Sequence, residues 1–161
     1  MQEENSDCPE GIVDVSIVVP SCFENPLKNH SIAFLSEVLK QEKRALIPVS
    51  AILGAYHITT RYLRVPRMTA KKILEGILNS DSPALYPNIS THTAIDALDY
   101  ASTYNIESWD GYLISLARSV GTTVIYSLDR ELSKVKEAII VNPFPQNAVE
   151  RYHKYLNSKI K

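Results

Sequence analysis

Short apolar runs alternate with longer runs of helical period along this chain. The strand-like runs cover residues 11–19, 44–50, 82–90, 122–128 and 138–144, and the helix-like runs cover 32–41, 51–63, 69–80, 91–104, 108–120 and 147–160. A helix that joins two parallel strands carries the chain back across one face of the sheet, so this alternation favours a parallel sheet with helices on both faces. We therefore predict an α/β fold, a three-layer α/β/α sandwich with a mostly parallel central sheet.

Small residues mark the expected ends of several helices. Ser50, Thr69 and Ser108 stand at the beginning of helical runs, where a side-chain oxygen can accept a hydrogen bond from a free amide of the first turn. Gly121 follows the run 108–120 and is expected to close that helix.

The chain is long enough for one domain and too short for two comfortable ones. Its 161 residues are 45% hydrophobic, which is sufficient for a single sizeable core. We expect a flexible acidic tail over residues 1–10 and one domain over residues 11–161. The formal net charge of -1 gives no overall attraction to a nucleic acid or a membrane, so any such binding depends on local clusters of charge.

Cysteine usage favours a reducing compartment, and hydropathy gives no sign of export or of a membrane span. Cys8 and Cys22 match neither a disulfide framework nor a zinc site with its four ligands. The segment MQEENSDCPE lacks the basic and apolar parts of a signal peptide, and no apolar run approaches the ~20 residues that span a bilayer. We expect a cytoplasmic protein with no membrane partner.

Three aspartates occupy positions next to the expected carboxyl ends of strands. Asp14 comes directly after residues 11–13, Asp129 follows the run 122–128, and Asp110 lies in the first turn of the helix that leads into that run. In a parallel α/β sheet these positions share one edge, where binding groups gather. Clustered carboxylates repel one another unless one is protonated or a cation binds. The set therefore predicts a site for Mg²⁺ or Mn²⁺, which prefer oxygen ligands.

Each aspartate also has a purely structural explanation. The helix dipole favours Asp110 in a first helical turn, and Asp129 is suited to capping the turn DREL. A charged Asp14 inside a buried strand would cost several kcal/mol. Asp14 must therefore lie at a strand end, pair with another group or bind a cation.

Each aspartate belongs to a short motif. The motifs are Asp14 with Ser16 two residues later, Trp109 directly before Asp110, and Ser127 two residues before Asp129. They occur within the ordered segments VDVSIVVPSCFENP, ALIPVSAILGAYHI, YNIESWDGYLISLARSVGTTVIYSLDREL and IIVNPF. In this order the chain resembles a PIN domain of the kind found in prokaryotic toxin ribonucleases of the VapC type, over residues 12–144.

The resemblance implies a metal-dependent endoribonuclease. Asp14, Asp110 and Asp129 would be catalytic and would hold one or two Mg²⁺ or Mn²⁺ ions that activate a water and neutralise charge on the phosphate. Ser16, Ser127 and Glu131 would support these ligands or metal-bound water from outside. The implied partners are RNA and, for the toxin of a toxin–antitoxin pair, an antitoxin protein.

One acidic position that is usual in PIN domains is missing. The family commonly has a glutamate on the helix after the second strand, and here Gly54 or a near neighbour occupies that place. Residues 43–74 contain neither aspartate nor glutamate. The sequence leaves open which acid compensates, and the candidates are Glu24, Asp96, Asp99, Glu107 and Glu131.

The same acid-free stretch is rich in cations. Arg61, Arg64 and Arg67 are candidate RNA contacts, because phosphate contacts supply most of the nonspecific affinity for nucleic acids. The alternatives are a solvated helix face or the surface of a homodimer. In a homodimer, the residues expected to pack against the second copy are Tyr56, Tyr62 and Leu63.

Other functional classes fit less well or remain open. A catalytically inactive PIN-like module would bind RNA or a protein through the same basic face, and the missing acid favours it. A haloacid-dehalogenase-like phosphatase requires a second aspartate where the chain has Ser16. A response-regulator receiver requires an aspartate after the third strand, which ALYPNIS lacks, and no GxGxxG or GxxxxGK[ST] loop occurs.

Overall fold

Five parallel strands form the sheet of the computed structural model, which describes residues 8–160. The strand order is β3-β2-β1-β4-β5. In the central strand, Ile12 pairs with Leu46 of β2 on one side and with Ile125 of β4 on the other. The strands are short: β1 (Gly11–Val13), β2 (Ala45–Pro48), β3 (Leu85–Tyr86), β4 (Val124–Tyr126) and β5 (Ile139–Val141).

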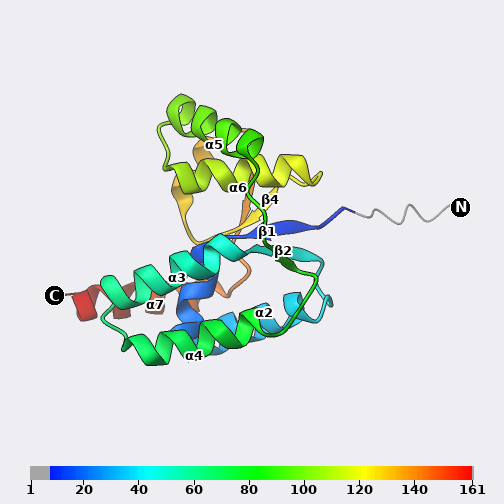
Figure 1. Cartoon of the computed structure of the whole chain (residues 1–161). Helices are drawn as coiled ribbons and strands as arrows, with labels where there is room; N and C mark the ends of the chain where they lie inside the picture. Colours follow the sequence, from blue (N-terminus) through cyan, green and yellow to red (C-terminus); the bar gives the residue numbers. More distant parts are fainter. Residues whose placement is uncertain (1–7, 161) are drawn as a thin grey trace, which may run out of the picture.

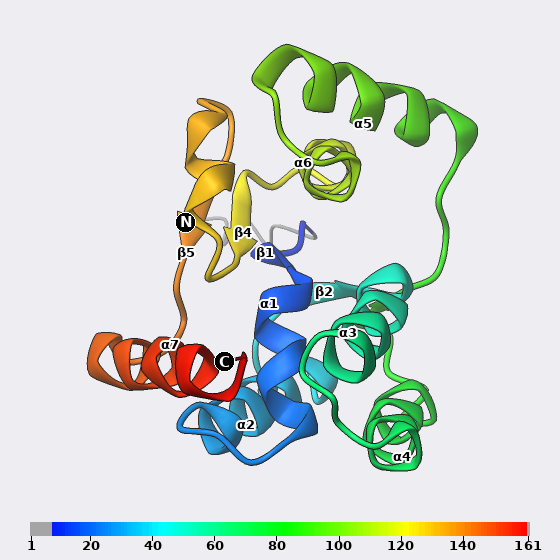
Figure 2. The ribbon, with the colours of Figure 1, turned by 90° about the vertical axis from the view of Figure 1, so that its left-hand side faces the viewer.

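Helices cover both faces of this sheet (Figures 1 and 2). One face carries α1 (Val15–Val18), the 3-10 helix η1 (Val19–Cys22), α2 (Lys28–Leu39), α3 (Val49–Arg61), α4 (Arg67–Leu78) and α7 (Gln146–Ile160). The other carries α5 (Thr91–Tyr104), α6 (Ser108–Ser119) and the 3-10 helix η2 (Arg130–Lys134). The predicted three-layer α/β/α fold with a parallel sheet is confirmed. Within residues 8–160, no helix is both long and apolar enough to cross a membrane.

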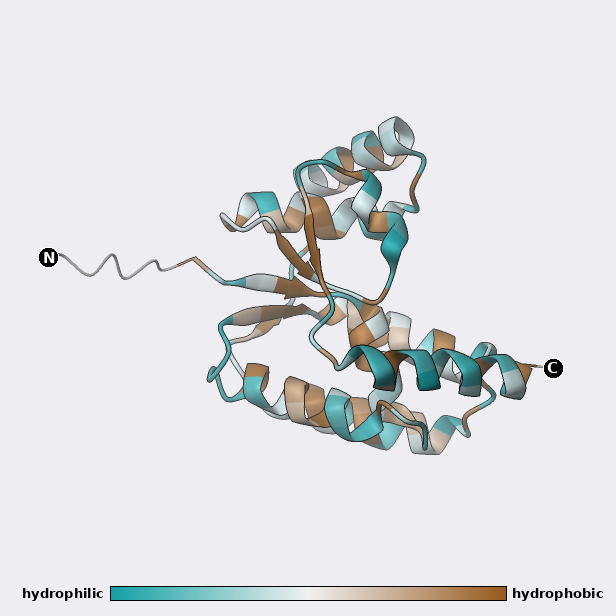
Figure 3. Ribbon diagram, turned by 180° about the vertical axis from the view of Figure 1, so that it is seen from behind, coloured by the Kyte–Doolittle hydropathy of each residue, from teal (hydrophilic) through white to brown (hydrophobic). Residues whose placement is uncertain are grey.

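Neighbouring residues of the central strands face opposite layers. Ile12 and Ile125 pack in the apolar cluster under α6, whereas Val13 and Tyr126 belong to the larger cluster on the other face. Side chains alternate between the two faces of a sheet, so a strand covered on both faces needs apolar residues at every position. Figure 3 accordingly shows strands coloured as hydrophobic between helices whose outer turns are hydrophilic.

The first strand is shorter than predicted, because the run 11–19 is a strand only as far as Val13. Asp14 has an extended backbone, and the amide of Ile17 donates to its carbonyl oxygen at 3.1 Å, which begins the helical segment. Ile17 and Val18 are fully buried in that segment. A helix of 4 residues is too short to show a helical period, so hydrophobic periodicity did not distinguish it from a strand.

The predicted helix caps are only partly right. The structure places Pro48 and Pro66 before α3 and α4, so Ser50 and Thr69 lie inside the first turns. The fixed φ of proline suits the start of a helix, which explains the earlier beginnings. Ser108 is likewise the first residue of α6 and not its cap. Gly121 does close that helix, in a left-handed conformation with φ of 83°.

The expected tail falls mainly on residues 1–7, which lie outside the described residues. Residues 8–10 run beside the edge of the sheet where β1 begins. The amide of Glu10 donates to the carbonyl oxygen of Arg44 at 2.6 Å, and the Thr122 hydroxyl donates to the carbonyl oxygen of Glu10 at 3.0 Å.

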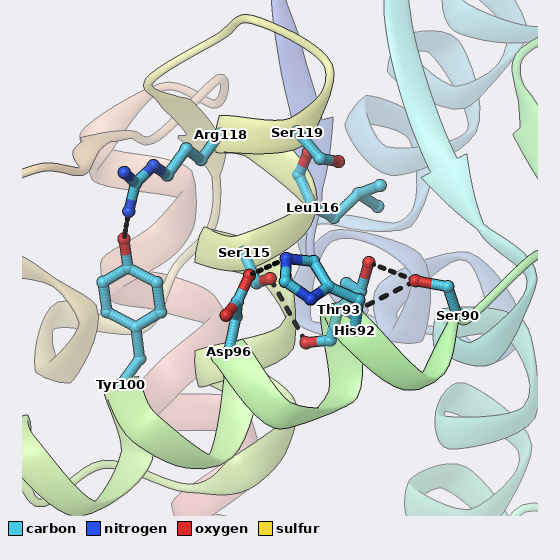
Figure 4. A network of polar contacts seen from close by, with 9 residues as sticks. All are labelled: Ser90, His92, Thr93, Asp96, Tyr100, Ser115, Leu116, Arg118 and Ser119. Atoms are coloured by element: carbon cyan, nitrogen blue, oxygen red, sulfur yellow. Dashed lines mark hydrogen bonds and ion pairs between the residues drawn. The ribbon is translucent and has the colours of Figure 1, made fainter.

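Helices α5 and α6 approach each other closely at Gly111. A Cβ atom at this position would lie 2.2 Å from the carbonyl oxygen of Ala97. Figure 4 shows part of the polar network that joins the two helices, including the hydrogen bond from the Ser115 hydroxyl to the carbonyl oxygen of Thr93 at 3.2 Å. The absence of a side chain at Gly111 therefore allows α5 to lie this close to α6.

Gly111→Ala is expected to destabilise the protein by about 1–3 kcal/mol, because the new methyl group overlaps a backbone oxygen that cannot rotate away. Gly76→Ala is the matched control inside another helix, since no atom lies within 4 Å of the added carbon. The control should be as stable as the parent, or more stable by up to about 1 kcal/mol through helix propensity. Urea unfolding measures both variants, and equal stability of the two would contradict the close contact.

Candidate functional site

Asp14 stands at the carboxyl end of the central strand, where the chain turns into α1. Its amide donates to the carbonyl oxygen of Tyr126 at 3.0 Å, which continues the ladder between β1 and β4. The residue is only 4% exposed. A strand end was one of the three positions that the sequence allowed for Asp14, and the structure places the residue there.

Two serine hydroxyls hold the Asp14 carboxylate, and we call this arrangement the serine clamp. Ser16 and Ser127 each donate to Oδ2 of Asp14 at 2.7 Å. Each serine oxygen also accepts a backbone amide, from Leu128 at 2.9 Å and from Asp129 at 3.0 Å respectively. A hydroxyl has one hydrogen to donate. Both hydrogens point to one carboxylate oxygen, so the clamp suits an ionised Asp14.

Burial and hydrogen bonding act on the Asp14 carboxyl in opposite directions. Burial raises its pKa above the ordinary value, because the charged form loses its hydration. The Ser127 and Ser16 hydroxyls oppose this rise, as do the backbone amides of Val15 and Ser16. None of the ion pairs in the described part of the chain includes Asp14. Asp14 is thus a buried acid supported by neutral donors, without a cationic side chain.

Asp110 lies in the first turn of α6, which Figure 2 shows end-on above the sheet, over β1 and β4. The pKa of Asp110 is raised from its usual value to about 7. Burial is the largest cause, followed by the negative charges of Asp14, Asp129, Glu107 and Glu131. The helix dipole alone would lower this pKa, so burial and the surrounding carboxylates together outweigh it. Acidic groups from three separate segments therefore share one electrostatic environment.

Asp129 lies after β4 and begins η2. Its Oδ1 accepts the amide of Glu131 at 2.9 Å, so the capping role considered from the sequence is present. Its own amide donates to the Ser127 oxygen and so takes part in the serine clamp. Glu131, expected to support the site from outside, forms an ion pair with Lys134. The cap and the electrostatic effect on Asp110 coexist in one residue.

The carboxylates influence one another without meeting at one point. Within residues 8–160, no group of three or more His, Cys, Asp or Glu side chains is arranged to hold a metal ion. The donor chemistry nevertheless fits Mg²⁺ or Mn²⁺, because the groups are carboxylate and hydroxyl oxygens in a region of excess negative charge. A divalent ion bound here would offset the repulsion among these groups. Convergence of the three aspartates on a metal stays a prediction.

The five candidates for an acid that compensates at the site lie in different surroundings. Glu107 and Glu131 act on the pKa of Asp110. Glu24 instead pairs with Lys28 at 2.5 Å, and the remaining candidates, Asp96 and Asp99, belong to α5. A Cβ atom at Gly54 would lie 3.4 Å from Cγ2 of Val15, so the position of the missing acid borders the residue after Asp14.

The basic stretch lies on the hairpin of α3 and α4, which extends past the sheet on the side where the strands end (Figure 1). Arg61, Arg64 and Arg67 are exposed, and no ion pair in the described residues includes them. The predicted dimer surface needs correction, because Leu63 is 5% exposed and belongs to the core. The leucine and tyrosine that do face outward are Leu53 and Tyr62.

A cavity that the sequence did not indicate lies beside Asp129. It has a volume of about 730 Å³ and is lined by residues from the ends of β4 and β5, from η2 and from α7. Its polar side chains, including Asn142, Gln146 and His153, come from separate segments, so no local motif marked them.

Comparisons with known proteins bear on the fold alone. No protein-family model matches the chain, and no curated protein matches it. Among solved structures, the chain is similar to the crystal structure of PAE2754 from Pyrobaculum aerophilum, with 20% sequence identity and a TM-score of 0.58. The similarity covers 94% of this chain and 89% of that chain. The two chains share their overall architecture across nearly their whole lengths.

Proposed function

We propose that this protein is a metal-dependent endoribonuclease of the PIN type, which cleaves RNA phosphodiester bonds. The observation that carries the proposal is the raised pKa of Asp110, caused by burial and by carboxylates from its own helix start and from two other segments. Repulsion of this kind costs folding free energy, so a chain that keeps it gains something else from the arrangement. Binding of a divalent cation and a phosphate is the function that best accounts for it.

In this proposal, Asp14, Asp110 and Asp129 would hold Mg²⁺ or Mn²⁺. The bound ion would lower the pKa of an attacking water and neutralise charge that develops on the phosphate. The serine clamp keeps the Asp14 carboxylate in one orientation and favours its charged form. Asp110 would change from partly protonated to fully ionised on binding the cation, and release a proton near neutral pH.

Millimolar Mn²⁺ is expected to raise the melting temperature and to support cleavage of single-stranded RNA. An ion that binds only the folded state stabilises it by about 2.7 kcal/mol at one hundred times its Kd. Addition of EDTA should reverse both effects. The absence of a thermal shift, with RNA intact at high protein concentration, would contradict the nuclease proposal.

The basic hairpin is proposed to bind RNA phosphates. Changing Arg61, Arg64 and Arg67 to Ala should weaken RNA binding and flatten its dependence on salt. With fewer phosphate contacts, binding releases fewer counterions from the RNA. Arg118→Ala is a suitable control, since Arg118 is an exposed arginine at the far end of α6 from Asp110. Fluorescence anisotropy at several salt concentrations measures the slope, and an unchanged slope in the triple variant would exclude phosphate contacts there.

A catalytically inactive PIN-like binding module is the second candidate. It is favoured by the lack of a three-ligand metal group in the described residues and by Gly54 at the place of the usual acid. Such a module would bind RNA or a protein such as an antitoxin without cleaving RNA. A homodimer through the exposed Leu53 and Tyr62 is compatible with both candidates, and light scattering that detects only an 18.1 kDa species would exclude it.

A further inference from the structure

The cavity beside Asp129 is continuous with the candidate site. It shares Ser127 and Asp129 with the site, and from there it extends between η2 and α7. Its volume of about 730 Å³ falls in the range of pockets that hold a small ligand. A molecule bound at the carboxylates therefore has room to place a neighbouring group in this space.

The cavity combines apolar surface with carboxamides. Leu128, Ile140 and Val149 supply the apolar part. Asn142 is held in place, because its Oδ1 accepts the amide of Phe144 at 2.9 Å. Its Nδ2 makes only a long contact of 3.5 Å with Oε1 of Gln146. Both amide groups thus retain donors and acceptors that a ligand in the cavity can use.

The charges around the cavity are mixed and do not suit a phosphate. Arg130 contributes a positive charge, whereas Asp129 and Glu150 contribute negative charges. Gln146, Glu150 and His153 lie four and three residues apart on α7, so they share one helix face toward the cavity. A flat, uncharged group with donors and acceptors along its edge is complementary to these walls.

We propose that this cavity is a nucleobase subsite, which receives a base of the RNA strand whose phosphate lies at the aspartates. The proposal rests on the nuclease function proposed above and specifies how its substrate is selected. The apolar side chains and the ring of His153 pack against the base, and the Gln146 and Asn142 amides hydrogen-bond its edge. Single-stranded RNA is commonly recognised in this way, by packing on the base and by polar contacts with its edges.

Nuclear magnetic resonance titration with each of the four ribonucleoside 5′-monophosphates tests the subsite directly. EDTA is present throughout, so binding is measured without metal and without cleavage. We expect chemical-shift changes at the backbone amides of Asn142, Gln146 and His153, with different affinities for the four bases. Gln146→Ala should weaken binding of the preferred nucleotide at least fivefold. Asn157→Ala removes an exposed carboxamide of α7 that does not line the cavity, and it should leave binding unchanged.

The outcomes separate this inference from the nuclease proposal. Shift changes confined to the α3–α4 hairpin, equal binding by Gln146→Ala and the parent, or no binding at millimolar nucleotide would overturn the subsite even if RNA is cleaved. Base-selective binding in the cavity without any Mn²⁺-dependent cleavage would support the subsite and remove the nuclease. For an oligonucleotide, Gln146→Ala should change affinity but not the salt slope, because a base contact releases no counterion.

Discussion

Asp14→Asn and Asp110→Asn are each expected to abolish the Mn²⁺-induced rise in melting temperature and to reduce RNA cleavage by at least about 100-fold. Asparagine keeps the shape of aspartate and removes the ligand charge. At position 14 its oxygen can still accept the Ser16 and Ser127 hydroxyls, so the serine clamp and the fold should survive. Thermal unfolding with Mn²⁺ and cleavage of labelled single-stranded RNA give the two readouts.

The metal-free Asp110→Asn variant should also show a distinct dependence of stability on pH. Because the pKa of Asp110 is raised to about 7, the folded chain binds a proton here that the unfolded chain releases near the ordinary value of 3.8. The parent should therefore be most favoured by this group below pH 4, and this contribution is lost as the pH rises through about 7. Asparagine removes the loss, so the variant should gain stability relative to the parent at pH 8.

Asp99→Asn is the matched control for these changes, since Asp99 is an exposed aspartate on α5 that does not act on the pKa of Asp110. It should keep the Mn²⁺ shift, the cleavage rate and the pH dependence of the parent. A normal Mn²⁺ shift in Asp14→Asn would rule out Asp14 as a ligand. Loss of the shift together with loss of the folded spectrum would instead point to a structural role of the clamp.

Gly54→Glu is expected to increase Mn²⁺ affinity about tenfold or more, because it adds a charged ligand. A tenfold change in Kd corresponds to about 1.4 kcal/mol of binding free energy. The new side chain would start beside Val15, at a distance of 3.4 Å that is ordinary van der Waals contact. Glutamate is also a better helix former than glycine. The change would place a carboxylate on α3, which packs against α1 directly after Asp14, and RNA cleavage should rise with metal affinity.

Two further substitutions at the same position isolate the charge. Gly54→Ala reports the gain in helix propensity, about 0.5–1 kcal/mol, without a new ligand. Gly54→Gln has the shape of glutamate without its charge. Isothermal titration with Mn²⁺ should therefore distinguish Glu from both, and without metal Gly54→Glu should be less stable than Gly54→Gln because of repulsion from Asp14. Equal Mn²⁺ affinity of the Glu and Gln variants would show that this position does not reach the site.

The layered fold could be predicted because its signals are local. Apolar period and segment length distinguish most strands from most helices, and the order of the two types fixes a parallel sheet. The exception was the segment after Val13, where a helix of 4 residues is too short to show a helical period and has Ile17 and Val18 fully buried, as a strand would. The caps at Ser50 and Thr69 failed because α3 and α4 begin earlier, directly after Pro48 and Pro66, and no side chain caps either helix.

The candidate site was only half determined by the sequence. The cost of burying a charge limited Asp14 to a strand end, a paired position or a metal site, because that cost applies in any fold with a buried first strand. The tertiary structure alone decided that Ser127 and Ser16 share one oxygen of Asp14, that Leu63 is buried, and that a cavity opens beside Asp129. It also decided the pKa of Asp110, because an electrostatic field sums over charges by their distance in space. Sequence patterns record only separation along the chain, and in this fold acids from three segments act on one another across the end of the sheet.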